Sequence, residues 1–200
     1  MPQTSINRIM AGLLELINNK RPDEIEELSR DSLEWFRNNL RSVRKRPEQL
    51  LRDGDFVRNT YTGKMYMYFY DAKHKSTLPY WDRFPLIIML EHYEDGFLGL
   101  NLHYIAPRYR VVLLNELYTY LRNEENDDNS TRLVITYNLI KAVSRLKFAK
   151  PCIKRYLTSH IDSRVAEVPV EYWDMMSMLP SQKFVNANAN TVYAKSRNKF

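Results

Sequence analysis

The side chains that could do chemistry gather within residues 64–104, where histidines lie among carboxylates. They would bind a metal ion if they converged at ligand distance. The stretch has no His-x-His pair and no His-Glu-x-x-His motif, so the spacing does not favour a metal site. His160, beside a basic segment, is expected at the surface. The histidines and acids of the stretch are His74, His92, His103, Asp71, Asp82, Glu91, Glu94 and Asp95.

Motifs for other enzymatic chemistry are absent from the sequence. No Gly-x-Ser-x-Gly elbow is present, and a total of five glycines leaves no Walker A loop and no dinucleotide fingerprint. Cys152 follows Lys150-Pro151, where a helix start would lower its thiol pKa, but a single cysteine is more commonly structural. Asp71-Ala72-Lys73 has a superficial likeness to a nuclease strand but lacks an acidic partner. The sequence therefore predicts a non-enzyme with no cofactor and no small-molecule substrate.

Basic side chains are the second chemically useful group. The 200-residue chain carries a formal net charge of +6. The positive charge is concentrated in residues 37–64, 141–164 and 181–200, whereas residues 23–34 and 124–128 are acidic. Such asymmetry favours contact with a polyanion or an acidic protein surface, and solvated helix faces are the alternative. The side chains predicted to contact phosphates are Arg41, Arg44, Lys45, Arg46, Lys147, Lys150, Lys154, Arg155, Lys195 and Arg197.

Aromatic side chains crowd the same central stretch and allow two interpretations. Exposed rings beside basic groups would stack on unpaired bases, whereas buried rings would form the core of a small sheet. Residues 65–70 alternate between the two faces of a strand, so one set points inward and the other outward. We expect most of the rings to lie in the core. They are Tyr66, Tyr68, Phe69, Tyr70, Tyr80, Trp81, Phe84, Tyr93, Phe97 and Tyr104.

The helices and strands that position these side chains are predicted from the spacing of apolar residues along the chain. Within residues 1–52, apolar side chains recur at helical intervals, Pro22 suits a helix start, and one further turn follows Pro47. Residues 53–106 predict a small antiparallel β unit with strands at 65–70, 84–90 and 97–102. Turns are expected at 53–55, 62–63 and 95–96.

Residues 107–180 predict helices again, at 110–121, 133–148, 151–157 and 171–179, with an extended segment at 165–170. After Pro180, repeated Asn and Ala predict an extended basic tail over residues 181–200 that would order on binding. The predicted fold class is α+β. Residues 1–180 form one domain, with N-terminal helices, a central β unit and C-terminal helices, and the tail follows.

Composition narrows the class of protein. A hydrophobic content of 44% is enough for a packed core. No run of eighteen or more apolar residues predicts a membrane span, and residues 1–20 do not resemble a signal peptide. The single cysteine excludes an internal disulfide and suits a reducing cytoplasm. Because no membrane span and no signal peptide are predicted, we expect no membrane partner.

Two runs carry a resemblance to a known family, KMYMYFYDAKHKSTLPYWDRFPLI and DGFLGLNLHY, at residues 64–87 and 95–104. Together with their flanks, over residues 58–121, they resemble the DNA end-protector family of T-even-like, contractile-tailed phages. The resemblance implies a minor virion protein that shields the end of the packaged genome from host exonuclease and takes part in head–tail joining.

The implied partners are a double-stranded DNA end and other phage virion proteins. The implied locations are the virion and, during assembly, the host cytoplasm. The same residues also agree with a purely structural neck, tail or baseplate protein that contacts only other proteins.

Overall fold

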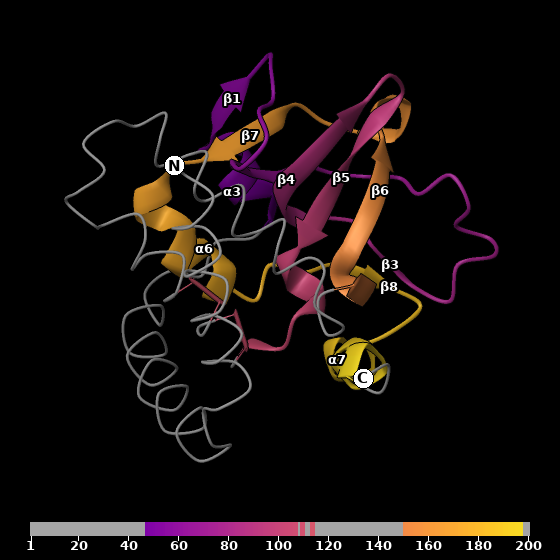
Figure 1. The fold of residues 1–200 in the computed structure, drawn as a ribbon. Helices are drawn as coiled ribbons and strands as arrows, with labels where there is room; N and C mark the ends of the chain where they lie inside the picture. Colours follow the sequence, from indigo (N-terminus) through magenta and orange to yellow (C-terminus); the bar gives the residue numbers. More distant parts are fainter. Residues whose placement is uncertain (1–46, 108, 111–112, 115–149, 198–200) are drawn as a thin grey trace, which may run out of the picture.

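A computed structural model describes residues 47–107, 109–110, 113–114 and 150–197 (Figure 1). The helices predicted within residues 1–46 and 115–149 lie outside the described residues. Residues 107, 109, 110, 113 and 114 are helical, in agreement with the helix predicted there. The elements in chain order are α3 (Pro47–Arg52), β1 (Asp55–Val57), β2 (Met65–Met67), β3 (Trp81–Asp82), β4 (Leu86–Tyr93), β5 (Gly96–Asn101), η1 (Leu102–Tyr104), η2 (Lys150–Cys152), β6 (Ile153–Leu157), η3 (Thr158–His160), β7 (Val165–Val168), η4 (Val170–Tyr172), α6 (Trp173–Met178), β8 (Phe184–Val185) and α7 (Ala189–Arg197).

Six strands form an antiparallel sheet in the order β1-β7-β2-β4-β5-β6, and β3 pairs with β8 in a second, two-stranded sheet. β4 and β5 form a hairpin in which Tyr93 faces Gly96, and its register shifts between Met89 and Glu91. β6 adds to the outer edge of β5, while β7 lies between β1 and β2. The main sheet thus combines strands from two distant parts of the chain.

The mixed α+β class agrees with this arrangement, and the strands expected around 65–70, 84–90 and 97–102 are confirmed as β2, β4 and β5. The extended segment near 165–170 and the helix near 171–179 are confirmed as β7 and α6. The helix predicted at 151–157 is wrong, because Ile153–Leu157 is strand β6. The β unit therefore does not end at residue 106.

Both faces of the main sheet are buried around its centre. On one face, Met65 and Ile88 are fully buried and belong to a cluster that includes Leu50 of α3 and Trp173 of α6. The other face forms a second, aromatic-rich cluster around Tyr66. Burial on both faces explains why β4 begins as an unbroken apolar run rather than an alternating one.

The aromatic cluster confirms that most of the central rings belong to the core. Tyr68 makes edge-to-face contacts with Phe97 and Tyr156, at centroid distances of 5.9 and 5.6 Å. Tyr70 packs on Tyr156 in the same way at 5.0 Å. Edge-to-face packing is the favoured arrangement of buried rings. Tyr93 is an exception, since 41% of it is exposed.

The C-terminal segment is folded onto the rest of the described structure. Its strand β8 pairs with β3, and its helix α7 buries Val192 completely. Asn188 Oδ1 accepts the backbone N–H of Thr191 at 2.8 Å, which satisfies a donor in the first turn of α7. The prediction of an extended tail is therefore wrong for residues 189–197, which form α7. Among the described residues, no helix has the length and apolar character needed to cross a membrane.

Candidate nucleic-acid interface

Two of the predicted phosphate-binding lysines lie over neighbouring aromatic rings. Lys154 extends from β6 with its Nζ 4.3 Å from the centroid of Tyr104, and Lys195 of α7 places its Nζ 5.3 Å from that of Tyr80. The two ring centroids are 6.0 Å apart. Phe184 of β8 packs edge-on against Tyr104 at 5.1 Å. We call Lys154, Lys195, Tyr80, Tyr104 and Phe184 the basic–aromatic face.

Cation–π contacts hold an ammonium group in place without using its hydrogens for ion pairing. A lysine ammonium has three N–H donors, so an ammonium group that lies on a ring can also donate to a phosphate oxygen. The lysines come from β6 and α7, which are brought together because α7 packs next to η1 (Figure 1). The fold therefore joins two of the basic segments that the sequence analysis singled out.

Arg155 does not belong to this face. Successive side chains of a strand point to opposite sides, so Arg155 points away from Lys154. It pairs with Asp95 and lies 4.0 Å above the ring of Tyr93, both in the β4–β5 hairpin. The structure therefore places Lys154 and Arg155 on opposite sides of β6 and does not bring these two predicted side chains together.

The remaining predicted contacts cannot be placed on the face. Lys150 opens η2 and Arg197 closes α7, and only their backbone positions are described. Five predicted side chains fall outside the described residues. These are Arg41, Arg44, Lys45, Arg46 and Lys147.

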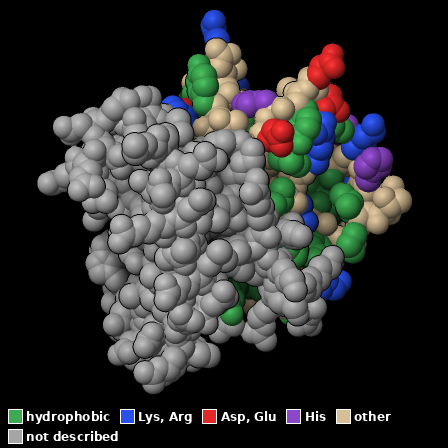
Figure 2. All heavy atoms as spheres, in the orientation of Figure 1, with side chains coloured by type: hydrophobic (Ala, Val, Ile, Leu, Met, Phe, Trp, Pro, Cys, Tyr) green, Lys and Arg blue, Asp and Glu red, His purple; other side chains and the backbone are tan. Residues whose placement is uncertain are grey.

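A basic loop that the sequence analysis did not single out for DNA contact connects β2 to β3 and projects from the sheet (Figure 1). Its Lys73, His74 and Lys75 are all exposed. Figure 2 shows basic and histidine side chains over this loop, whereas acidic side chains gather over the tip of the β4–β5 hairpin. In the sequence, this loop could have been identified from Lys73 and Lys75, which lie two positions apart and shortly before Leu78-Pro79.

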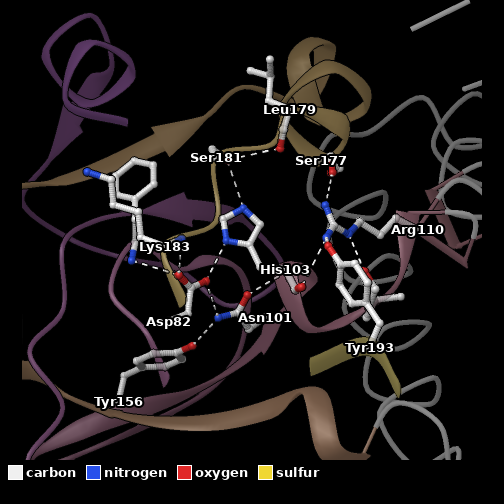
Figure 3. A network of polar contacts seen from close by, with 12 residues as sticks. Asp82, Asn101, His103, Arg110, Tyr156, Ser177, Leu179, Ser181, Lys183 and Tyr193 are labelled. Atoms are coloured by element: carbon white, nitrogen blue, oxygen red, sulfur yellow. Dashed lines mark hydrogen bonds and ion pairs between the residues drawn. The ribbon is translucent and has the colours of Figure 1, made fainter. Parts of the chain in front are cut away.

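A buried polar network surrounds Asp82 (Figure 3). Asp82 Oδ1 accepts the backbone N–H groups of Phe84 at 3.0 Å and Lys183 at 3.1 Å. Its Oδ2 accepts from Asn101 Nδ2 at 3.2 Å and from His103 Nδ1 at 2.7 Å. The carboxylate thereby ties β3 to η1, to the end of β5 and to the segment before β8.

The environment of Asp82 favours its ionised form. Burial by itself would raise the pKa of this carboxyl group, but the charge and hydrogen bond of His103 and the two backbone donors outweigh it. The pKa of Asp82 is consequently lowered. The four hydrogen bonds make Asp82 the central acceptor of the network.

The network also has the connectivity of a Ser-His-Asp triad. His103 Nε2 lies 3.1 Å from Ser181 Oγ, and His103 Nδ1 contacts Asp82. Nucleophilic catalysis requires that a substrate reach the serine. Ser181 is only 4% exposed and His103 is fully buried, so the contacts are those of a structural link.

Arg110 is a buried cation that fixes α7 (Figure 3). It donates to the carbonyl oxygens of Ile105 and Ser177 at 2.6 and 2.7 Å and to Tyr193 Oη at 2.8 Å. Burial lowers the pKa of its guanidinium, and the contact with Tyr193 opposes that effect. Because Tyr193 lies in the same helix as Lys195, Arg110 helps to set the position of the basic–aromatic face.

The other residues considered for chemistry are placed apart. His74 lies in the exposed loop, His92 is exposed on β4 and His103 is buried. Within the described ranges, no three or more metal-ligating side chains come together. Burial raises the pKa of the Cys152 thiol to about 12, so the lowered pKa considered for a helix start is wrong.

The two lysines of the basic–aromatic face and the exposed basic loop are groups in the described residues that could contact phosphates. A comparison with protein-family models matches residues 6–197 to the phage T4 terminal DNA protecting protein family, and the chain belongs to that family. Searches of curated proteins and of solved structures gave no match. The match extends the resemblance seen at residues 58–121 to almost the whole chain.

Proposed function

We propose that the protein binds the ends of double-stranded phage DNA through the basic–aromatic face and does not cut the DNA. The observation that carries this proposal is the convergence of Lys154 and Lys195 over adjacent rings in a chain of this family. Lysine contacts to phosphates are independent of base sequence. A protein that protects a terminus by this means would accept any terminal sequence.

The test is a titration of an end-labelled linear duplex at several salt concentrations, with a covalently closed circle as competitor. Each neutralised phosphate contributes about −0.9 to the slope of log K against log salt. Lys154→Gln and Lys195→Gln should each weaken binding and reduce the steepness of that slope by about 0.9. The double variant should reduce it by about twice as much.

Arg155→Gln is the matched control, because it removes one cation from the same strand but from its opposite side. It should leave the affinity and the salt slope close to those of the unmodified protein. An effect of Arg155→Gln as large as that of Lys154→Gln would show that the interface lies elsewhere. Binding that ignores salt, or no binding to linear DNA, would refute the proposal.

We further propose that the protein acts in the virion and takes part in head–tail joining, as the family resemblance implies. Its presence among the proteins of purified particles is the direct check. Labelled DNA incubated with the protein and Mg²⁺ should keep its length, and shortening would contradict the non-catalytic role. A role confined to protein assembly would be indicated by particles that contain the protein while the purified chain binds no DNA.

A further inference from the structure

Preference for a DNA end requires a contact that only an end offers. Phosphates repeat along the whole duplex, so Lys154 and Lys195 alone bind the middle of a molecule as well as its terminus. What distinguishes a blunt end is the flat, apolar face of the terminal base pair. A protein side chain that covers this face must be apolar, exposed and close to phosphate-binding groups.

Leu78 meets these three requirements. It lies in the loop between β2 and β3, is 38% exposed, and is followed by the exposed Pro79. The next residue is Tyr80, whose ring lies beneath Lys195. The apolar Leu78-Pro79 step therefore directly precedes a residue of the basic–aromatic face in the chain.

Hydrogen bonds within the loop and at its base hold its conformation. The backbone N–H of Leu78 donates to the His74 carbonyl oxygen at 2.9 Å, and that of Lys75 donates to Ala72 at 3.2 Å. At its base, Asp71 N–H donates to the His160 carbonyl oxygen at 3.0 Å, and His160 Nδ1 donates to the Asp71 carbonyl oxygen at 2.8 Å. A preformed loop loses little conformational entropy on binding.

The charge of the loop also favours DNA. The carboxylate of Asp71 is paired with Lys75 at 2.7 Å, so it does not repel a phosphate as an isolated charge would. Lys73 is exposed and forms no ion pair with any described residue. It can reach a phosphate near the terminus while Leu78 covers the end.

We propose that the loop of residues 72–79 is the end-recognition element and that Leu78 packs against the terminal base pair of a blunt duplex. This inference rests on the proposed DNA-end binding and assigns the contact that makes it specific for ends. Apolar side chains are used in other complexes to cover or separate base pairs, so the chemistry is general.

The experiment compares two DNA molecules with the full-length chain. One is a blunt linear duplex, and the other is a dumbbell of the same duplex whose ends are closed by hairpin loops. The dumbbell keeps the phosphates but hides the terminal faces. The preference is the dissociation constant for the dumbbell divided by that for the linear duplex.

Leu78→Ser should lower this preference by roughly tenfold, which corresponds to about 1.4 kcal/mol of lost apolar burial. Its affinity for the dumbbell should not change. The fold is kept, because Leu78 contributes only its backbone N–H to the hydrogen bonds of the loop. Tyr172→Ser is the matched control, since Tyr172 is 53% exposed and lies on η4, away from this loop.

The outcomes separate the two proposals. If the unmodified protein prefers the linear duplex and Leu78→Ser keeps that preference, the loop is not the end-recognition element. If the unmodified protein binds both molecules equally, or neither, the proposed end binding itself is wrong. An equal loss in Leu78→Ser and Tyr172→Ser would assign the effect to general surface hydrophobicity and refute the inference.

Discussion

Replacement of Asp82 by asparagine tests the buried network most directly. The carboxylate accepts four hydrogen bonds, two at each oxygen. An asparagine side chain has one oxygen and one NH₂ group, so in either orientation its NH₂ would face two donors. The backbone N–H groups of Phe84 and Lys183, or the side chains of Asn101 and His103, would then lose their acceptor.

Loss of one partner of a buried charged pair costs about 3–5 kcal/mol. For a chain of this size, that free energy corresponds to a fall in Tm of roughly 10 °C. Denaturation by guanidinium chloride, followed by circular dichroism at pH 7, measures the free energy of unfolding. Asp71→Asn is the control, because about half of that side chain is exposed and its loss should be much less harmful.

The pH dependence gives a second check with a defined sign. The folded-state pKa of Asp82 is lowered, so its stabilising effect is present above the pKa of the unfolded chain, near 4. The effect is lost as the pH falls through the lower, folded-state pKa. The difference in stability between the unmodified protein and Asp82→Asn should therefore shrink below about pH 4. A difference under about 1 kcal/mol at pH 7, or one that stays constant into acid, would refute the reasoning.

Two further predictions concern packing and thiol chemistry. Gly96→Ala should destabilise the fold by about 1–3 kcal/mol, because its new Cβ would meet the backbone carbonyl oxygen of Tyr156. Gly99→Ala should cost less, since its Cβ would meet side-chain atoms of Ile87 at 2.8 Å and beyond rather than backbone atoms, and comparable losses in thermal melts would contradict this. Cys152 should resist a disulfide reagent at pH 8 until the protein is unfolded, because its pKa is raised to about 12 and it is buried. Rapid labelling of the native protein would contradict that burial.

Local patterns in the sequence predicted the central strands and missed the outer ones for a physical reason. β2, β4 and β5 are apolar, bounded by turns and paired with near neighbours in sequence. β6 contains Lys154 and Arg155 and follows Pro151, and a proline is typical of the first turn of a helix. It is a strand because β5 offers it an open edge, and a long-range pairing of this kind leaves no local signal.

The candidate site, too, could be predicted from the sequence only where local patterns were enough. Lys154 and Lys195 were identified as basic residues, but only the packing of α7 reveals that they share a face. The partners of Asp82 come from positions up to 101 residues away in the chain, as for the N–H of Lys183, so no spacing rule could have found them. The exposed loop could have been predicted from the sequence, because Lys73-His74-Lys75 is followed shortly by Leu78-Pro79.

The strand order also sets the order in which the sheet can be assembled during synthesis. β7 lies between β1 and β2, so Asp55 finds its partner Glu167 only after most of the chain has been made. The β4–β5 hairpin can form early because its strands are adjacent, whereas β1 and one edge of β2 must wait for β7. Long-range pairings of this kind slow folding and leave strand edges exposed in the nascent chain. A ribosome-bound fragment that ends before residue 165 would therefore display unpaired edges on which other chains could aggregate.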